Sequence, residues 1–111
     1  MKTIALAALA AVQLTLAADP EKSEPDARDK GADKLDVSAY PKAQQDRYAL
    51  FAQKCARCHP LARSINSRFT SQEWKRYMKR MVRRTGAGVT DEQSAEIYEF
   101  LKFYSSKLGL E

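Results

Sequence analysis

The chain is poor in the side chains that hold metals. Its 111 residues include two cysteines and a single histidine, His59. A structural zinc site takes about four Cys or His ligands, so these three side chains are too few to form one. The sequence also has no nucleophile–base pair, carboxylate dyad or phosphate-binding loop. We therefore expect a protein that is not an enzyme in its own right.

Long hydrophobic runs are also scarce, and the chain has one, from Ile4 to Leu16. It follows one positive charge, Lys2, and ends at small residues, Thr15 and Ala17, in the positions that a signal peptidase reads. The run is too short to span a bilayer comfortably. Residues 1–17 are therefore predicted to be a cleaved signal peptide that leaves no stable membrane anchor, with an uncleaved anchor as the alternative. Without Lys2, the mature chain has 18 basic and 14 acidic residues, a net charge of +4.

Residues 18–39 have few large apolar side chains and many Asp, Glu, Lys, Pro and Ala residues. Such a segment cannot bury enough surface to offset the entropy lost on ordering, so it is predicted to be a disordered charged lead or tether. Its opposite charges nearly cancel, which argues against an arm that binds nucleic acid. We expect no nucleic-acid partner.

The most informative stretch is Cys55-Ala56-Arg57-Cys58-His59. Two cysteines separated by two residues and followed by histidine are the attachment signature of c-type haem. Each thiol adds to one haem vinyl group, and the next imidazole ligates the iron. A thioredoxin-like redox pair would need strands that alternate with helices, and a simple disulfide would close a very short loop with little entropic gain. The motif therefore predicts one covalently attached haem c, with His59 as the proximal iron ligand.

Residues 40–111 are predicted to form a single all-α domain. One helix begins near Tyr40 and leads into Cys55, and residues 61–69 are expected to be irregular. Capping boxes at Thr70 and Thr90 predict two more helices, the first of which Gly86 can end. Helical spacing predicts an apolar face on each of these two helices. The faces comprise Trp74, Tyr77, Met78, Met81 and Val82 on the first, and Ile97, Phe100, Leu101 and Tyr104 on the second.

Residues 50–59 resemble the N-terminal helix and haem loop of the class I c-type cytochromes, and the final helix resembles that family's C-terminal helix. Phe51 stands where the family has an aromatic residue that packs on the C-terminal helix, whereas Arg47 replaces a usual glycine. The resemblance implies a small class I cytochrome c fold, in which the N- and C-terminal helices cross around one covalently bound haem. The family often holds the proximal imidazole through a proline carbonyl. No proline follows Pro60, so the partner of His59 is not identified.

The resemblance also bears on the sixth iron ligand. A thioether is a usual partner of histidine in electron-carrying cytochromes, and short bacterial periplasmic members place it shortly before the C-terminal helix. Arg80-Met81 is similar to their pattern, so Met81 is the expected distal ligand, with Met78 one turn away as the alternative. Trp74 and Met78 are expected to line the haem.

The resemblance implies a periplasmic monohaem cytochrome that carries single electrons between redox partners. Basic residues near the haem loop suggest docking to a partner with an acidic surface, although a solvated helix face would have the same composition. Two other functions stay open: a haem-based small-ligand binder or sensor with a labile sixth site, and a non-catalytic haem subunit of a larger oxidoreductase. The basic residues are Lys54, Arg57, Arg63 and Arg68.

Overall fold

The computed structural model describes residues 25–84 and 86–110. Its regular elements are a 3-10 helix, η1 (Ala27–Lys30), and four α-helices, α1 (Lys42–Cys55), α2 (Leu61–Ile65), α3 (Ser71–Val82) and α4 (Asp91–Lys107). Within those two ranges there is no strand, so the predicted all-α class is confirmed for this part of the chain. The predicted signal peptide, residues 1–17, lies outside the described residues.

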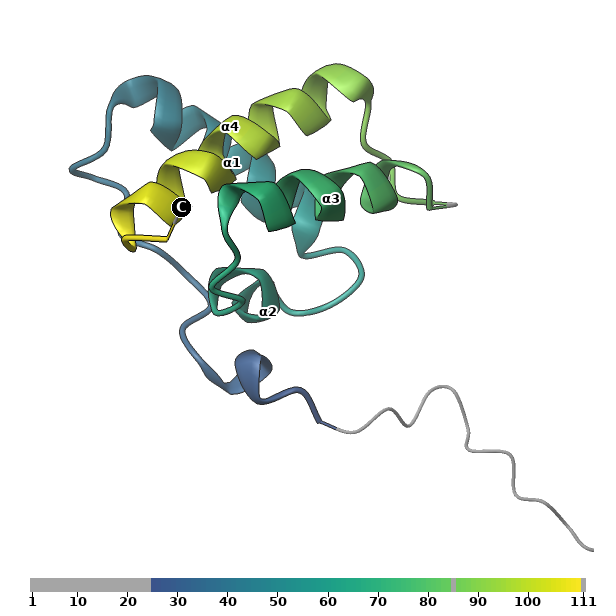
Figure 1. Cartoon of the computed structure of the whole chain (residues 1–111), viewed down its shortest axis with the longest axis horizontal. Coiled ribbons are helices and arrows are strands. Elements are labelled where there is room, and N and C mark those ends of the chain that lie inside the picture. Colours follow the sequence, from purple (N-terminus) through teal and green to yellow (C-terminus); the bar gives the residue numbers. More distant parts are fainter. Residues whose placement is uncertain (1–24, 85, 111) are drawn as a thin grey trace, which may run out of the picture.

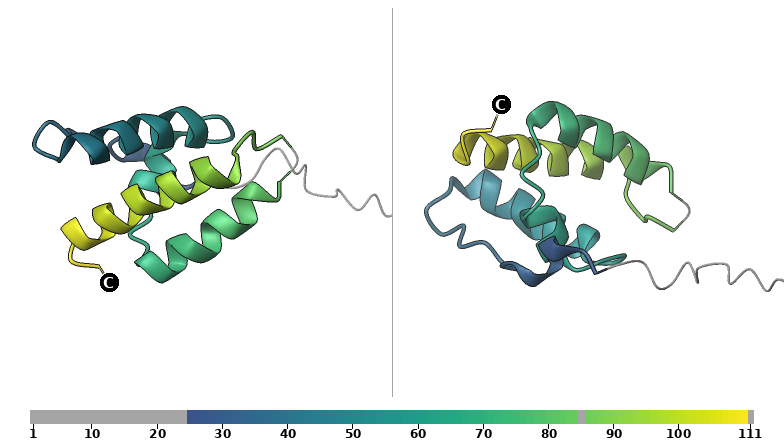
Figure 2. Two further views of the ribbon diagram at one scale, coloured as in Figure 1. Left: turned by 90° about the horizontal axis from the view of Figure 1, so that it is seen from above. Right: turned by 60° about the horizontal axis from the view of Figure 1, so that its bottom comes forward.

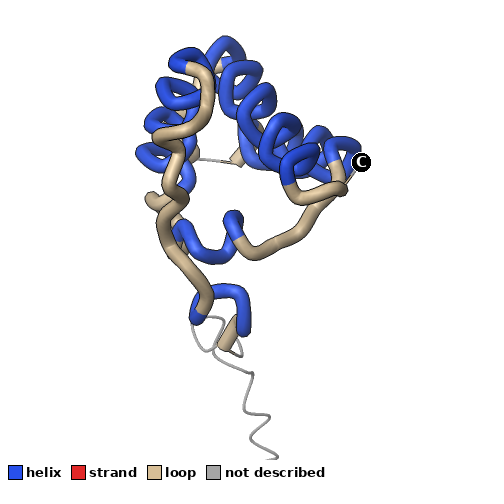
Figure 3. The backbone as a smooth tube through the Cα atoms, turned by 90° about the vertical axis from the view of Figure 1, so that its left-hand side faces the viewer, coloured by secondary structure: helices blue, strands red, loops and turns tan. Residues whose placement is uncertain are grey.

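Helix α4 is the centre of the arrangement. It packs against both α1 and α3, and it crosses α1 in Figure 1. Seen from above in Figure 2, α4 lies between these two helices. The short helices α2 and η1 contact each other and lie beyond one edge of the three longer helices, as Figure 3 shows. The chain therefore has one core around α4, with a small annex built from α2 and the N-terminal segment.

The core forms where the sequence predicts it. The expected inward face of α4 is buried, and the ring of Phe51 on α1 lies 5.4 Å from that of Phe100 on α4. Arg47 forms an ion pair with Glu96 at 2.7 Å, and this pair links α1 to α4. The buried face of α4 comprises Ile97, Phe100, Leu101 and Tyr104.

The predicted helix starts are confirmed, and one predicted helix end is not. Thr70 and Thr90 each form a capping box, in which the side-chain oxygen accepts from the backbone N–H three residues on. These bonds satisfy N–H groups that have no partner within the helix. α3 ends at Val82, four residues before Gly86. Hydrogen-bonded turns follow it, and in one of them the Arg84 N–H donates to the Met81 carbonyl at 3.2 Å. Gly86 adopts a positive φ of 81° in the next turn.

Residues 61–69 are not irregular throughout, contrary to the prediction, because α2 occupies Leu61–Ile65. Pro60 precedes this helix, and the side-chain amide of Asn66 donates to the Ala62 carbonyl at 2.8 Å at its end. Five residues are too few to show a helical period. The capping side chain and the burial of Ile65 stabilise a helix that the sequence pattern does not reveal.

The prediction of disorder for residues 18–39 is also wrong in its described part, which begins at residue 25. There the guanidinium of Arg63 donates two hydrogen bonds to the carboxylate of Asp29, at 3.0 and 2.7 Å. Arg28 donates to the hydroxyl of Ser67 at 2.9 Å. We call residues 25–38, held on α2 by these bonds, the N-terminal clamp. The composition rule missed it because specific polar pairs, together with the packing of Leu35 against the core, fix the segment.

Candidate functional site

The two motif cysteines lie in different environments. Cys55 is the last residue of α1 and belongs to the core, where 8% of its surface is exposed, whereas Cys58 is exposed. Burial, together with the neighbouring Cys58, raises the pKa of the Cys55 thiol to about 12. Because the thiolate is the reactive form of cysteine, Cys55 is the less reactive thiol in this conformation. Both side chains are free thiols.

Each ring nitrogen of His59 takes part in one hydrogen bond. Nδ1 lies 3.1 Å from the carbonyl oxygen of Pro60, and Nε2 lies 3.2 Å from the hydroxyl of Tyr77. A carbonyl only accepts, so Nδ1 donates its proton to Pro60, and Nε2 accepts from Tyr77. This tautomer leaves the lone pair on Nε2, the form in which histidine ligates a metal. The acceptor that the sequence does not identify is therefore the carbonyl of the very next residue.

Tyr77 is a site residue that sequence reasoning missed, since its spacing placed it on an apolar face. Burial raises the pKa of the Tyr77 hydroxyl, as does its proximity to Cys55. The hydroxyl therefore stays protonated at neutral pH and can donate to Nε2 of His59. Its ring packs edge-on against Trp74, with the ring centroids 5.4 Å apart. Tyr77 is 18 residues from His59 along the chain, so no local sequence pattern reveals this contact.

A cavity of about 310 Å³ lies beside His59. Cys58, His59 and Met81 all line it, so three residues singled out by the sequence converge on one space. Its remaining lining comes from the N-terminal clamp, from α2 and α3, and from the segments that directly follow these two helices. The further lining residues are Arg28, Arg63, Ser64, Ser67, Phe69, Tyr77, Arg80 and Arg84.

The two methionines of α3 face different spaces. Met81 is half-buried and lines the cavity beside His59. Met78 is 4% exposed, belongs to the core, and lines a groove between α3 and α4 that does not include His59. Trp74 is buried in the core at 1% exposure and reaches the cavity only through its contacts with Phe69 and Tyr77. The structure therefore brings Met81 to His59, and it does not bring Trp74 or Met78 to that cavity.

Four arginines line the cavity, and two of them, Arg80 and Arg84, form no ion pair within the described residues. Arg28 and Arg63 are paired with acidic residues of the N-terminal clamp, and the Arg63 hydrogen bonds hold the pKa of Asp29 below its usual range. Arg80 lies over the ring of Tyr77, 5.9 Å from its centroid. Such a wall suits a ligand with an apolar body and carboxylate groups. Arg28 carried no sequence signal, because its segment was predicted to be disordered.

No family model, curated protein or solved structure matches this chain. Among the helices of the described residues, none has both the length and the apolar character needed to cross a membrane.

Proposed function

We propose that the protein is a monohaem c-type cytochrome of the periplasm that carries single electrons between redox partners. In this proposal Cys55 and Cys58 hold the haem as thioethers, His59 is the proximal iron ligand and Met81 is the distal one. The observation that carries it is the convergence of Cys58, Nε2 of His59 and Met81 on one cavity. A motif match that had arisen by chance would not require a methionine from another helix to lie in the same space.

The residues around this cavity fit a haem. Cys58 lines the cavity and would supply one thiol, and Cys55, at the buried end of α1, would supply the other. The Pro60 hydrogen bond keeps the Nε2 lone pair available. The arginines of the wall match the two carboxylates of a haem, and Phe69 supplies apolar surface. The Tyr77 hydroxyl stands on Nε2 in this conformation, so its side chain must turn away when iron takes that position. When bound, the haem supplies a one-electron iron couple.

The surrounding side chains then set the properties of that couple. The carbonyl of Pro60 holds the imidazole in one orientation and makes it a stronger ligand. A thioether from Met81 raises the reduction potential. With His59 and Met81 both holding the iron, the protein would offer no open position for a substrate. These features favour an electron carrier over an enzyme.

The partner that we propose is a redox protein with an acidic docking surface. Exposed cations, among them Arg80 and Arg84, border the cavity, and Arg57 lies in the attachment motif itself. Charge of one sign around the exposed edge of a site mainly accelerates encounter with a partner of opposite charge. The rate of electron exchange with such a partner should therefore fall as ionic strength rises.

Optical spectra test the proposal directly. The chain is produced by export in a host that attaches haem c. Its absorption spectra are then recorded in the ferric and ferrous forms, with and without carbon monoxide. A low-spin spectrum with the methionine–iron charge-transfer band, insensitive to carbon monoxide, is the expected result. A protein that carries no covalent haem would overturn the proposal. Ready binding of carbon monoxide would replace the electron carrier by a small-ligand binder, and co-purification with a catalytic protein would make it a subunit.

A further inference from the structure

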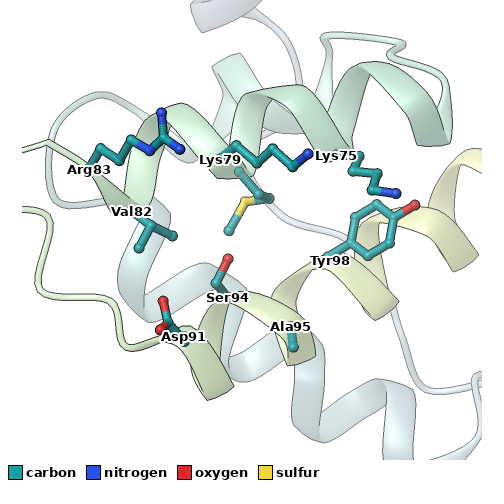
Figure 4. A pocket seen from close by; sticks show the side chains of 9 residues that line it. Lys75, Lys79, Val82, Arg83, Asp91, Ser94, Ala95 and Tyr98 are labelled. Carbon is teal, nitrogen blue, oxygen red and sulfur yellow. The ribbon is translucent and has the colours of Figure 1, made fainter.

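A second concave site lies on the other flank of α3. This groove, of about 510 Å³, runs between α3 and α4 and shares no lining residue with the cavity beside His59. Its apolar lining comprises Met78, Val82 and Ala95, and Figure 4 shows Val82 and Ala95 among the residues around it. Ligand pockets in proteins range from about 300 to 1,000 Å³ and are mostly apolar with a few polar groups. The groove has the size and the floor of such a pocket.

Three cations, two on α3 and one directly after its end, form one rim of the groove. Lys75, Lys79 and Arg83 follow one another at intervals of four residues, so they lie in a row along one side of the helix. All three are exposed. Within the described residues, none of them forms an ion pair. Their charges therefore remain available to a ligand.

The opposite rim, on α4, makes the two ends of the groove differ. Asp91 lies at the same end as Arg83, so the charges there oppose each other (Figure 4). At the other end the hydroxyl of Tyr98 lies toward the amine of Lys75. The amine of Lys102 lies over the Tyr98 ring, 5.6 Å from its centroid, and supports the ring from outside the groove. One end is thus positive and the other is close to neutral.

We propose that this groove binds a medium-chain carboxylate, an amphipathic anion of small size. The carboxylate would lie between Lys75 and Lys79 and accept a hydrogen bond from the Tyr98 hydroxyl. Its hydrocarbon chain would cover Met78 and Val82, where burial of apolar surface is favourable. Asp91 repels a carboxylate from the other end, so the ligand has one orientation. This inference is independent of the proposed electron transfer, because it uses no residue of the cavity beside His59.

The test uses the full chain as purified and decanoate as the probe. Isothermal titration calorimetry should show saturable binding of one decanoate per chain. In NMR spectra the methyl groups of Met78, Val82 and Ala95 should shift with the same saturation curve. Absence of saturable binding, or shifts confined to residues outside the groove, would overturn the proposal.

Three variants at exposed positions separate the site from general attraction by a basic protein. Lys75→Gln/Lys79→Gln should weaken binding roughly tenfold or more, as expected when charge-assisted hydrogen bonds are lost. Ala95→Leu should abolish it by filling the groove without a change in charge. Arg76→Gln is the matched control, because Arg76 is an exposed cation of α3 that does not line the groove. Binding that survives Ala95→Leu, or that Arg76→Gln weakens equally, would refute the site.

One other occupant would give a different result. An acidic amphipathic helix from a partner protein could also match a basic rim and an apolar floor. An acidic helical peptide that binds with one-to-one stoichiometry while decanoate does not would show that the groove receives a protein. That result would overturn the carboxylate site. Circular dichroism of each variant should equal that of the parent chain, which keeps a loss of binding distinct from a loss of structure.

Discussion

The sharpest prediction compares two alanine substitutions on α3. Met81 lines the cavity beside His59, whereas Met78 is buried in the core and lines the groove on the other flank. Met81→Ala should therefore remove the methionine–iron charge-transfer band and lower the reduction potential, since a thioether ligand raises it. Met78→Ala should keep the band and instead lower the stability of the fold.

The size of the stability effect follows from burial. Met78 is 4% exposed, and replacement of a buried methionine by alanine costs about 2–5 kcal/mol. We expect the lower end, because the groove beside Met78 is open to solvent and no sealed cavity is left. A loss of about 2 kcal/mol corresponds to a fall in Tm of roughly 8–16 °C for a domain of this size. Met78→Leu, which nearly conserves volume, should cost less than about 1.5 kcal/mol.

The assay records the ferric spectrum, the reduction potential and the thermal unfolding curve of each variant from the same preparation. Met78→Leu is the control that keeps the core filled while it removes the sulfur. The reasoning would be refuted if Met78→Ala and Met78→Leu lost the charge-transfer band while Met81→Ala retained it. Loss of the band in neither alanine variant would mean that the sixth ligand is not a methionine of α3.

Three further predictions concern the core, the haem staple and the N-terminal clamp. Tyr104→Phe should cost about 1–3 kcal/mol in a denaturant titration, because the buried Tyr104 hydroxyl donates to the Ile65 carbonyl at 3.1 Å; unchanged stability would contradict this. Cys55→Ser/Cys58→Ser should be largely unfolded, since so small a core usually needs a staple, and full native helicity by circular dichroism would refute it. The folded-state pKa of Asp29 is lowered, so its contribution to stability is complete above the ordinary value of 3.8 and is lost as the pH falls through the lowered value. Protection of clamp amides from hydrogen exchange should therefore fall on acidification, and in Asp29→Asn at neutral pH; unchanged protection in that variant would count against the clamp.

The features that the sequence predicts correctly are local ones. Capping boxes join residues three apart, so Thr70 and Thr90 identify their helices without knowledge of the rest of the fold. The inward face of α4 repeats with the helical period, and burial of Phe100 follows from that repeat. The haem-attachment motif is also continuous in sequence, and the cofactor that it indicates stays a prediction. Each of these predictions depends on neighbours along the chain.

The features that it does not predict depend on contacts between distant residues. Arg63 and Asp29 are 34 residues apart, and no composition rule pairs two particular charges in a polar segment. The contact of Tyr77 with His59 depends on where α3 lies relative to the attachment motif. The five-residue helix α2 is stable because its neighbours cap and bury it. Position in three dimensions decides all three, and the sequence carries no local signal for it.

Helix α3 shows how one tertiary contact resolves an ambiguity that periodicity leaves open. Met78 and Met81 are three residues apart, so the helical period assigns both to one apolar face. α4 packs along one flank of α3 and takes Met78 into the core and the adjoining groove, while Met81 stays on the flank that faces His59. The cations divide in the same way, with Lys75 and Lys79 beside the groove and Arg80 beside the cavity. The proposal of Met81 as the distal ligand therefore depends on which flank α4 covers, a fact that neither methionine carries in its own sequence context.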